Sequence, residues 1–155
     1  MIKIMFVCHG NICRSPMAEF VFKNMVEKKG MLNKFYIASS ATSTEEIGNS
    51  VYPPARRKLM EHNISCEGKH SVQFRKDDYY KYDYIVAMDQ RNITNIFRII
   101  NEDSDKKVYK LLYFTNDSKD IADPWYSGDF DTTYDEICEG CKGLLDYIIT
   151  KDIHI

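Results

Sequence analysis

The sequence lacks any long apolar run, and it lacks a strong excess of charge of either sign. No stretch approaches the roughly 20 apolar residues that a membrane-spanning helix needs. The formal net charge is −2, so no basic surface for nucleic acid or for a membrane is indicated. Only one lysine and a few apolar residues precede Cys8, which is too little for a signal peptide. These absences predict a cytoplasmic protein that binds neither nucleic acid nor membrane.

Cysteine is present in an odd number, five, without a secretory signal. That usage indicates a reducing compartment. Cys138 and Cys141 have the spacing of a metal or redox pair, but no second ligand pair accompanies them, so we expect two half-buried helix cysteines. The sequence also has no internal repeat, low-complexity segment or linker, and its length predicts one domain over residues 1–155.

Apolar runs and helical patterns alternate along the chain. Apolar runs predict strands at residues 2–7, 35–38, 84–88 and 108–112. Helical spacing predicts helices at residues 16–29, 76–81, 90–100 and 132–150, and a Pro-Pro pair opens one at 53–62. Polar loops are expected at 39–44 and 113–128. This alternation indicates an α/β fold, with a largely parallel sheet and helices on both faces.

The loop between the first strand and the first helix holds a cysteine and an arginine. A helix start presents unpaired N–H groups and binds anions, phosphate in particular. Cys8 is a candidate nucleophile there, because a nearby cation such as Arg14 favours the thiolate. Gly10 and Asn11 suit a tight loop, since both tolerate left-handed backbone angles. Ser15 is expected to cap the helix and also to donate its hydroxyl to Cys8.

Two further segments are expected at the carboxyl ends of the strands, where ligands bind in such sheets. The first segment is the polar stretch that begins at Ser39, and the second is Asp89, which is expected to cap the helix after its strand. Asp123 lies in a later loop beside two aromatic residues, Trp125 and Tyr126. A carboxyl group in that position is a candidate proton donor and, later, a base.

The sequence resembles the low-molecular-weight protein tyrosine phosphatases. The resemblance rests on the string Val-Cys-His-Gly-Asn-Ile-Cys-Arg-Ser-Pro at residues 7–16 and on Asp-Pro-Trp-Tyr at residues 123–126. Length, motif position and element order agree over the whole chain. The resemblance implies a four-stranded parallel sheet, a phosphate-binding loop after the first strand, and hydrolysis of phosphomonoesters without a metal or a cofactor.

The resemblance also implies a role for individual residues. Cys8 would attack phosphorus and become a phosphocysteine, Arg14 and the loop amides would hold the phosphate oxygens, and Asp123 would act as general acid and base. Ser15 would assist departure of the thiolate. The phosphate-binding loop would further comprise His9, Gly10, Asn11, Ile12 and Cys13, and the supporting residues would be Ser39, His70 and Asp89.

Four positions bear on the substrate that this resemblance implies. Trp125 and Tyr126 keep an aromatic wall, whereas Glu45 falls where many family members have another aromatic residue. A more acidic and more open mouth is therefore expected. Ile12 stands where phosphoarginine-specific relatives carry threonine, which favours an aryl phosphate. The expected partners are tyrosine-phosphorylated proteins, with phosphate or vanadate as inhibitors, and the expected state is a monomer or a weak homodimer.

Three alternatives follow from the same residues. An arsenate reductase shares the Cys-x5-Arg loop but needs two further cysteines close together near it, and Cys66 stands alone. A phosphotyrosine-binding module without activity would lack Cys8, Arg14 or Asp123, and all three are present. Cys13 could form a reversible disulfide with Cys8 or could simply fill the underside of the loop; the sequence leaves both open.

Overall fold

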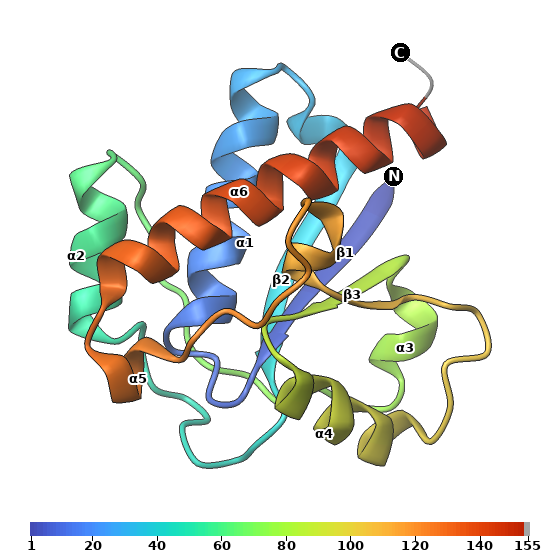
Figure 1. The fold of residues 1–155 in the computed structure, drawn as a ribbon, viewed down its shortest axis with the longest axis horizontal. Coiled ribbons are helices and arrows are strands. Elements are labelled where there is room, and N and C mark those ends of the chain that lie inside the picture. The colour runs from blue at the N-terminus through green and yellow to red at the C-terminus, as the bar shows by residue number, and fades with distance from the viewer. Residues whose placement is uncertain (154–155) are drawn as a thin grey trace.

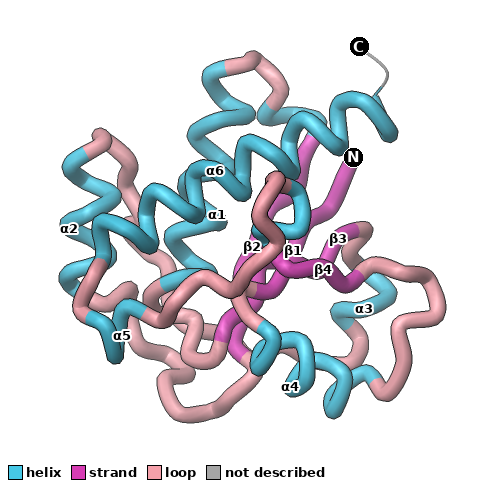
Figure 2. Tube along the Cα trace, in the orientation of Figure 1, coloured by secondary structure: helices cyan, strands magenta, loops and turns pink. Residues whose placement is uncertain are grey.

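A four-stranded sheet forms the centre of the structure, a computed structural model that describes residues 1–153 (Figures 1 and 2). Its strands are β1 (Ile2–Cys8), β2 (Phe35–Ala41), β3 (Tyr84–Ala87) and β4 (Val108–Lys110). The order is β2-β1-β3-β4, and all three pairings are parallel. The predicted α/β fold with a four-stranded parallel sheet is confirmed.

Helices cover both faces of this sheet (Figure 1). One face carries α1 (Arg14–Lys28), α2 (Pro53–Glu61) and α6 (Phe130–Ile148), and the other carries α3 (Asp78–Lys81) and α4 (Gln90–Ile100). The short α5 (Pro124–Ser127) precedes α6, and single helical turns occupy Leu32–Lys34, Leu111–Phe114 and Ile149–Ile153. No helix within residues 1–153 is both long and apolar enough to cross a membrane.

The central strand β1 shows why the sheet is covered on both sides. Ile4 and Phe6 point into the core formed with α1 and α6, and Met5 and Val7 point into the core formed with α4. All four side chains are buried. A strand whose alternate side chains enter two different cores must be apolar throughout, which explains its continuous apolar sequence.

The start of α1 differs from the prediction. The helix begins at Arg14, and Cys13 is its N-terminal flanking residue, without a side-chain cap. Ser15 therefore lies in the first turn and does not cap the helix. Its hydroxyl instead interacts with Cys8 and Asn11. Asp89, in contrast, caps α4 as predicted, in a reciprocal capping box with Asn92.

Three other boundaries also differ from the predicted ones. β2 continues through Ser39 and Ser40, because it pairs with β1 as far as Cys8. β4 ends at Lys110, and the chain then forms a helical turn. The expected polar loop before the last helix contains α5, and α6 begins at Phe130. As a result, Asp123 is the N-terminal flanking residue of a short helix and not part of an open loop.

Candidate active site

The loop between β1 and α1 turns its carbonyl groups away from a small pocket of about 120 Å³. The carbonyl oxygens of residues 8, 9, 10 and 12 accept hydrogen bonds of 2.8–3.0 Å from Thr42 N, Ser43 N, Ser71 Oγ and Tyr52 N, respectively. Within residues 1–153, the N–H groups of residues 9, 10, 12 and 13 have no acceptor. These residues line the pocket, so the loop offers it free N–H donors at a helix start.

Cys8 lies at the floor of this pocket, at the end of β1. Its Sγ accepts a hydrogen bond from the Asn11 backbone N–H at 3.3 Å and lies 3.0 Å from Ser15 Oγ. The Ser15 hydroxyl also accepts a hydrogen bond from Asn11 Nδ2 at 2.7 Å, so its own proton is free to point at the sulfur. Two donors thus converge on the thiol.

Asn11 has φ 58°, the left-handed conformation that its position in the loop requires. Gly10 does not share this need, because its φ is not positive. The Asn11 side chain donates to both Ser15 Oγ and Ser39 Oγ, and it accepts from the Val72 N–H. The loop is therefore clamped to β2 and to the segment after residue 70.

Glu19 extends this clamp on the buried side. It accepts a hydrogen bond from Ser39 Oγ at 2.6 Å and is only 4% exposed. Lys69 donates to the Ser39 carbonyl oxygen at 2.8 Å and lies 3.8 Å from Glu19. Because Ser39 gives its proton to a carboxylate, its oxygen is left to accept from Asn11.

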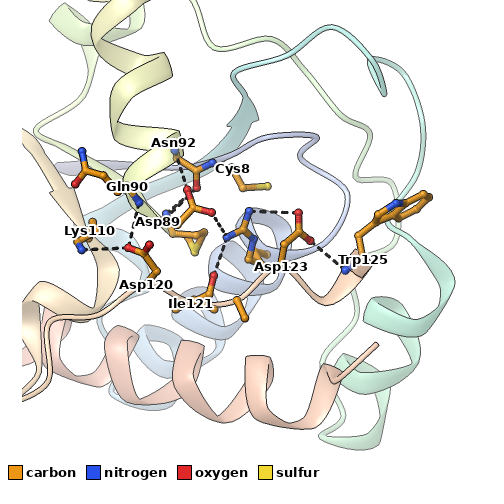
Figure 3. A network of polar contacts seen from close by, with 12 residues as sticks. Cys8, Asp89, Gln90, Asn92, Lys110, Asp120, Ile121, Asp123 and Trp125 are labelled. Carbon is orange, nitrogen blue, oxygen red and sulfur yellow. Dashed lines mark hydrogen bonds and ion pairs between the residues drawn. The ribbon is translucent and has the colours of Figure 1, made fainter. Parts of the chain in front are cut away.

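Two groups from other elements, labelled in Figure 3 as Asp89 and Ile121, hold the Arg14 side chain, which lines the pocket. Its Nη1 donates to Asp89 Oδ2 at 2.7 Å and to the Ile121 carbonyl oxygen at 2.8 Å. Burial works to lower the pKa of Arg14, but the charges of Cys8 and Asp89 raise it above its usual value. The guanidinium group is therefore charged and fixed in direction, as a donor to an anion must be.

Asp123 lines the same pocket, and Figure 3 shows it beside Trp125. Its Oδ2 is 3.5 Å from Arg14 Nη2, and its Oδ1 accepts from the Trp125 N–H at 3.0 Å. Pro124 follows it in the first position of α5, where proline fits a helix start. The short helix thus holds a carboxyl group over the pocket that Cys8 and Arg14 also line.

The rim of the pocket has an aromatic side and an acidic side. Trp125 and Tyr126 are 51% and 81% exposed, and Trp125 packs on Tyr52 with ring centroids 4.8 Å apart. The acidic residue Glu45 lines the same pocket, and its Oε2 lies 2.8 Å from Nε2 of His9 in the loop. Glu46 also lines the pocket, and no motif in the sequence indicated this.

Cys13 lies at the pocket, whereas His70 does not line it. Cys13 lines the pocket, and burial, followed by the charge of Cys8, raises the pKa of its thiol well above the usual range. The disulfide with Cys8 stays a prediction. His70 was expected to brace the loop, but it is exposed, and its backbone pairs with Ser50. Its neighbour Ser71 contacts the loop instead, by donating to the Gly10 carbonyl oxygen.

The remaining three cysteines lie outside the Cys8 pocket. Cys66, Cys138 and Cys141 do not line the Cys8 pocket, and all five cysteines are free thiols. Cys141 is buried against α1, where its thiol contacts the Ala18 carbonyl oxygen at 3.7 Å. Within residues 1–153, no group of three or more His, Cys, Asp or Glu side chains is arranged to hold a metal ion.

Comparison with known proteins agrees with this geometry. Residues 3–154 match the family described as low molecular weight phosphotyrosine protein phosphatase. The chain is 36% identical to the low molecular weight protein-tyrosine-phosphatase PtpA of Staphylococcus aureus (strain Newman), over 100% of this chain and 98% of that protein.

Solved structures show the same similarity. The crystal structure of YfkJ from Bacillus subtilis has a TM-score of 0.94 at 35% identity, over 98% of this chain and 97% of that one. The YwlE arginine phosphatase has a TM-score of 0.85 at 29% identity, over 99% of both chains. The match to the family covers nearly the whole sequence and includes the loop, the buried arginine and the carboxyl group above them. The chain therefore belongs to the low-molecular-weight phosphotyrosine protein phosphatase family.

Proposed function

We propose that this protein is a protein tyrosine phosphatase that hydrolyses aryl phosphomonoesters through a phosphocysteine on Cys8. One observation carries the proposal: the Cys8 sulfur lies at the floor of a pocket lined by free loop N–H groups, a buried guanidinium group and a carboxyl group. Nucleophile, anion binder and proton donor are the three parts that phosphoryl transfer from an aryl ester needs.

In the first step, the Cys8 thiolate attacks phosphorus, so that an S–P bond forms as the P–O bond to the phenol breaks. The loop N–H groups and Arg14 hold the three non-bridging oxygens, where the negative charge of the transition state is spread. Asp123 gives its proton to the departing phenolate oxygen. Its place at the pocket edge, next to the aromatic rim, suits a leaving group that points outward.

In the second step, Asp123, now a carboxylate, takes a proton from a water molecule that attacks phosphorus. The S–P bond breaks, inorganic phosphate is released and the Cys8 thiolate is restored. The Ser15 hydroxyl, 3.0 Å from Cys8 Sγ, stabilises the departing thiolate by donating its proton to a hydrogen bond. Free phosphate and vanadate are expected to compete, because both fit the same donors.

The substrate is proposed to be phosphotyrosine in proteins. Trp125 and Tyr126 offer an aromatic wall to a phenyl ring, and Ile12 adds an apolar side chain to the pocket lining. Phosphoarginine is the competing substrate, because the fold is shared with an arginine phosphatase. A guanidinium leaving group is polar and charged after protonation, and isoleucine offers it no hydrogen bond.

Hydrolysis of p-nitrophenyl phosphate, a phosphotyrosine peptide and a phosphoarginine peptide tests the proposal at mildly acid pH with EDTA present. We expect turnover of the first two and a much lower kcat/KM for the third. Cys8→Ser should lower turnover by roughly 10⁴-fold or more, as removal of a nucleophile does. Activity that survives Cys8→Ser would refute the mechanism, and a preference for phosphoarginine would refute the substrate.

A further inference from the structure

A second and larger hollow, of about 760 Å³, lies between α2 and the segment that follows it. We call it the α2 groove. Its lining includes one acidic side chain, Glu67, and four basic ones: Arg56, Arg57, Lys69 and His70. Its other lining residues are small, polar or apolar, so positive charge dominates in a concave surface. This arrangement suits an anion.

Two arginines of α2 give the groove its free charge. Arg56 and Arg57 are exposed, and neither forms an ion pair with an Asp or Glu of residues 1–153. The next residue of the helix behaves differently, since Lys58 pairs with both Glu61 and Asp131. The charge of Lys58, which does not line the groove, is thus balanced by acidic partners, whereas the two arginines that line the groove are unpaired in the described part of the chain.

The other two basic residues, Lys69 and His70, contribute less free positive charge to the groove than the arginines do. Burial lowers the pKa of Lys69, whose amino group is already bonded to the Ser39 carbonyl oxygen and lies near Glu19. His70 carries a charge only when its imidazole ring is protonated. Arg56 also acts on Cys66, a groove residue: burial raises the pKa of that thiol and the arginine opposes the rise. The arginines are therefore the groups that an incoming anion would meet.

The α2 groove neighbours the Cys8 pocket along the chain. Glu45 and Glu46 line the pocket, and Ser50 and Val51, a few residues later, line the groove. One short segment therefore forms part of both walls. A protein substrate bound at the pocket through one side chain has further residues that must pass over nearby surface. The groove is part of that surface, because Ser71, next to the groove residue His70, donates to the Gly10 carbonyl oxygen of the loop.

We propose that the α2 groove binds a second anionic group, a phosphate or a carboxylate, of the protein whose phosphotyrosine occupies the Cys8 pocket. This inference rests on the proposed function. Phosphate and carboxylate both match the planar donor fork of arginine, and the groove volume admits a peptide segment and not only a single ion. Binding there would act by tethering, because the second contact becomes intramolecular once the first is made.

A peptide series measures this effect in catalysis. Each peptide carries one phosphotyrosine, a Gly-Ser linker and a tail of glutamates, phosphoserines or glutamines, and the linker is lengthened in steps, because tethering is strongest when linker and span match. With the anionic tails, kcat/KM should rise about threefold to tenfold over the glutamine tail at the best length, as two partly exposed ion pairs provide. Raising the salt concentration should remove the gain.

Arg56→Gln combined with Arg57→Gln should abolish the tail effect while leaving p-nitrophenyl phosphate hydrolysis unchanged. Arg75→Gln combined with Arg98→Gln is the matched control, because it removes the same charge from exposed arginines that do not line the groove. The control should keep the tail effect. Absence of the effect in the wild type at every linker length, its survival in the groove variant, or its equal loss in the control would each overturn the proposal.

Binding without catalysis separates this proposal from the proposed function. Amide chemical shifts are followed while a glutamate-tailed peptide that lacks phosphotyrosine is titrated into the protein. Shifts should gather at residues 56–57 and 63–70 and vanish in the arginine variant. If these shifts appear but the protein does not hydrolyse phosphotyrosine, the anion-binding role of the groove is supported and the proposed function is refuted. Normal hydrolysis without these shifts would refute the groove alone.

Discussion

At the floor of the Cys8 pocket, Asn11, Arg14 and Ser15 are at most 2% exposed, whereas at its rim Trp125 and Tyr126 are 51% and 81% exposed. The floor residues are held by hydrogen bonds to β2, to α4 and to the loop before α5. The rim residues lie on a helix of four residues. The floor residues are thus tied to distant elements, whereas the rim residues belong to one short, exposed segment.

This difference follows from what each region has to do. Charge that develops on a phosphoryl group is stabilised best by donors that need not move, so the floor gains from being buried and clamped. A rim that contacts substrates of varied shape loses nothing by being exposed. Substitutions in the floor are therefore expected to lower turnover for every substrate, and substitutions in the rim to change the preference among substrates.

Asp123 lies between the two regions and should show the largest effect of the positions that remain to be tested. Asp123→Asn keeps the cap on α5 but removes the proton donor, so kcat should fall by roughly 10²–10⁴-fold. The fall should be larger for phenyl phosphate than for p-nitrophenyl phosphate, because p-nitrophenolate leaves more easily without a proton. Asp120→Asn, in the same loop but outside the pocket, is the control. A fall in kcat of less than about tenfold would show that Asp123 is not the proton donor.

Ser39 tests whether clamping of the floor matters for activity. Ser39→Ala removes a donor from the buried Glu19 and an acceptor from Asn11, which should cost about 1–3 kcal/mol of unfolding free energy. Looser positioning of Asn11 should lower kcat by about tenfold for all substrates. Denaturant unfolding and steady-state kinetics measure the two effects.

Ser40→Ala is the matched control for Ser39→Ala. Its hydroxyl is equally buried but donates to the Met5 sulfur on the other side of β2, away from the loop. It should lose some stability and keep its turnover. If both variants lose kcat alike, the effect belongs to the strand and not to the link between Ser39 and Asn11.

Trp125 should show the smallest effect, confined to the rim. Trp125→Ala removes a ring that would pack on the substrate, so kcat/KM for a phosphotyrosine peptide should fall about threefold to tenfold. Small aliphatic phosphates, which do not reach the rim, should be hydrolysed as before. Tyr113→Ala, a similarly exposed aromatic residue outside the pocket, provides the comparison. An equal loss of kcat/KM for all substrates would contradict this prediction, because it would mean that Trp125 affects catalysis in the way the floor residues do.

Local sequence predicted the parts of this protein that depend on neighbouring residues. The apolar run of β1, the capping of α4 by Asp89 and the order of strands and helices all follow from patterns within short segments. Helix α1 begins at Arg14, two residues earlier than predicted, and Ser15 does not cap it, because the Ser15 hydroxyl interacts with Cys8 and Asn11 rather than with the helix backbone. That competition involves a strand end and cannot be read from a capping pattern.

Contacts between distant segments could not be predicted from the sequence either, because they depend on how those segments pack. The residue that braces Gly10 is Ser71 and not His70, which is exposed and whose backbone pairs with Ser50. Glu19 lies four residues after Ser15 on α1, and only the packing of α1 against β2 turns its carboxylate toward Ser39.

The sequence by itself determined the chemical groups at the reactive loop and the type of fold around it. A cysteine, an arginine and a helix start within seven residues must lie close together, whatever the rest of the chain does. The tertiary structure decided how those groups are held: Asp89, Ile121 and Asp123 reach Arg14 from more than 70 residues away. Hydrogen bonds over such separations exist only after the sheet has formed, because parallel strands bring their carboxyl ends to one edge.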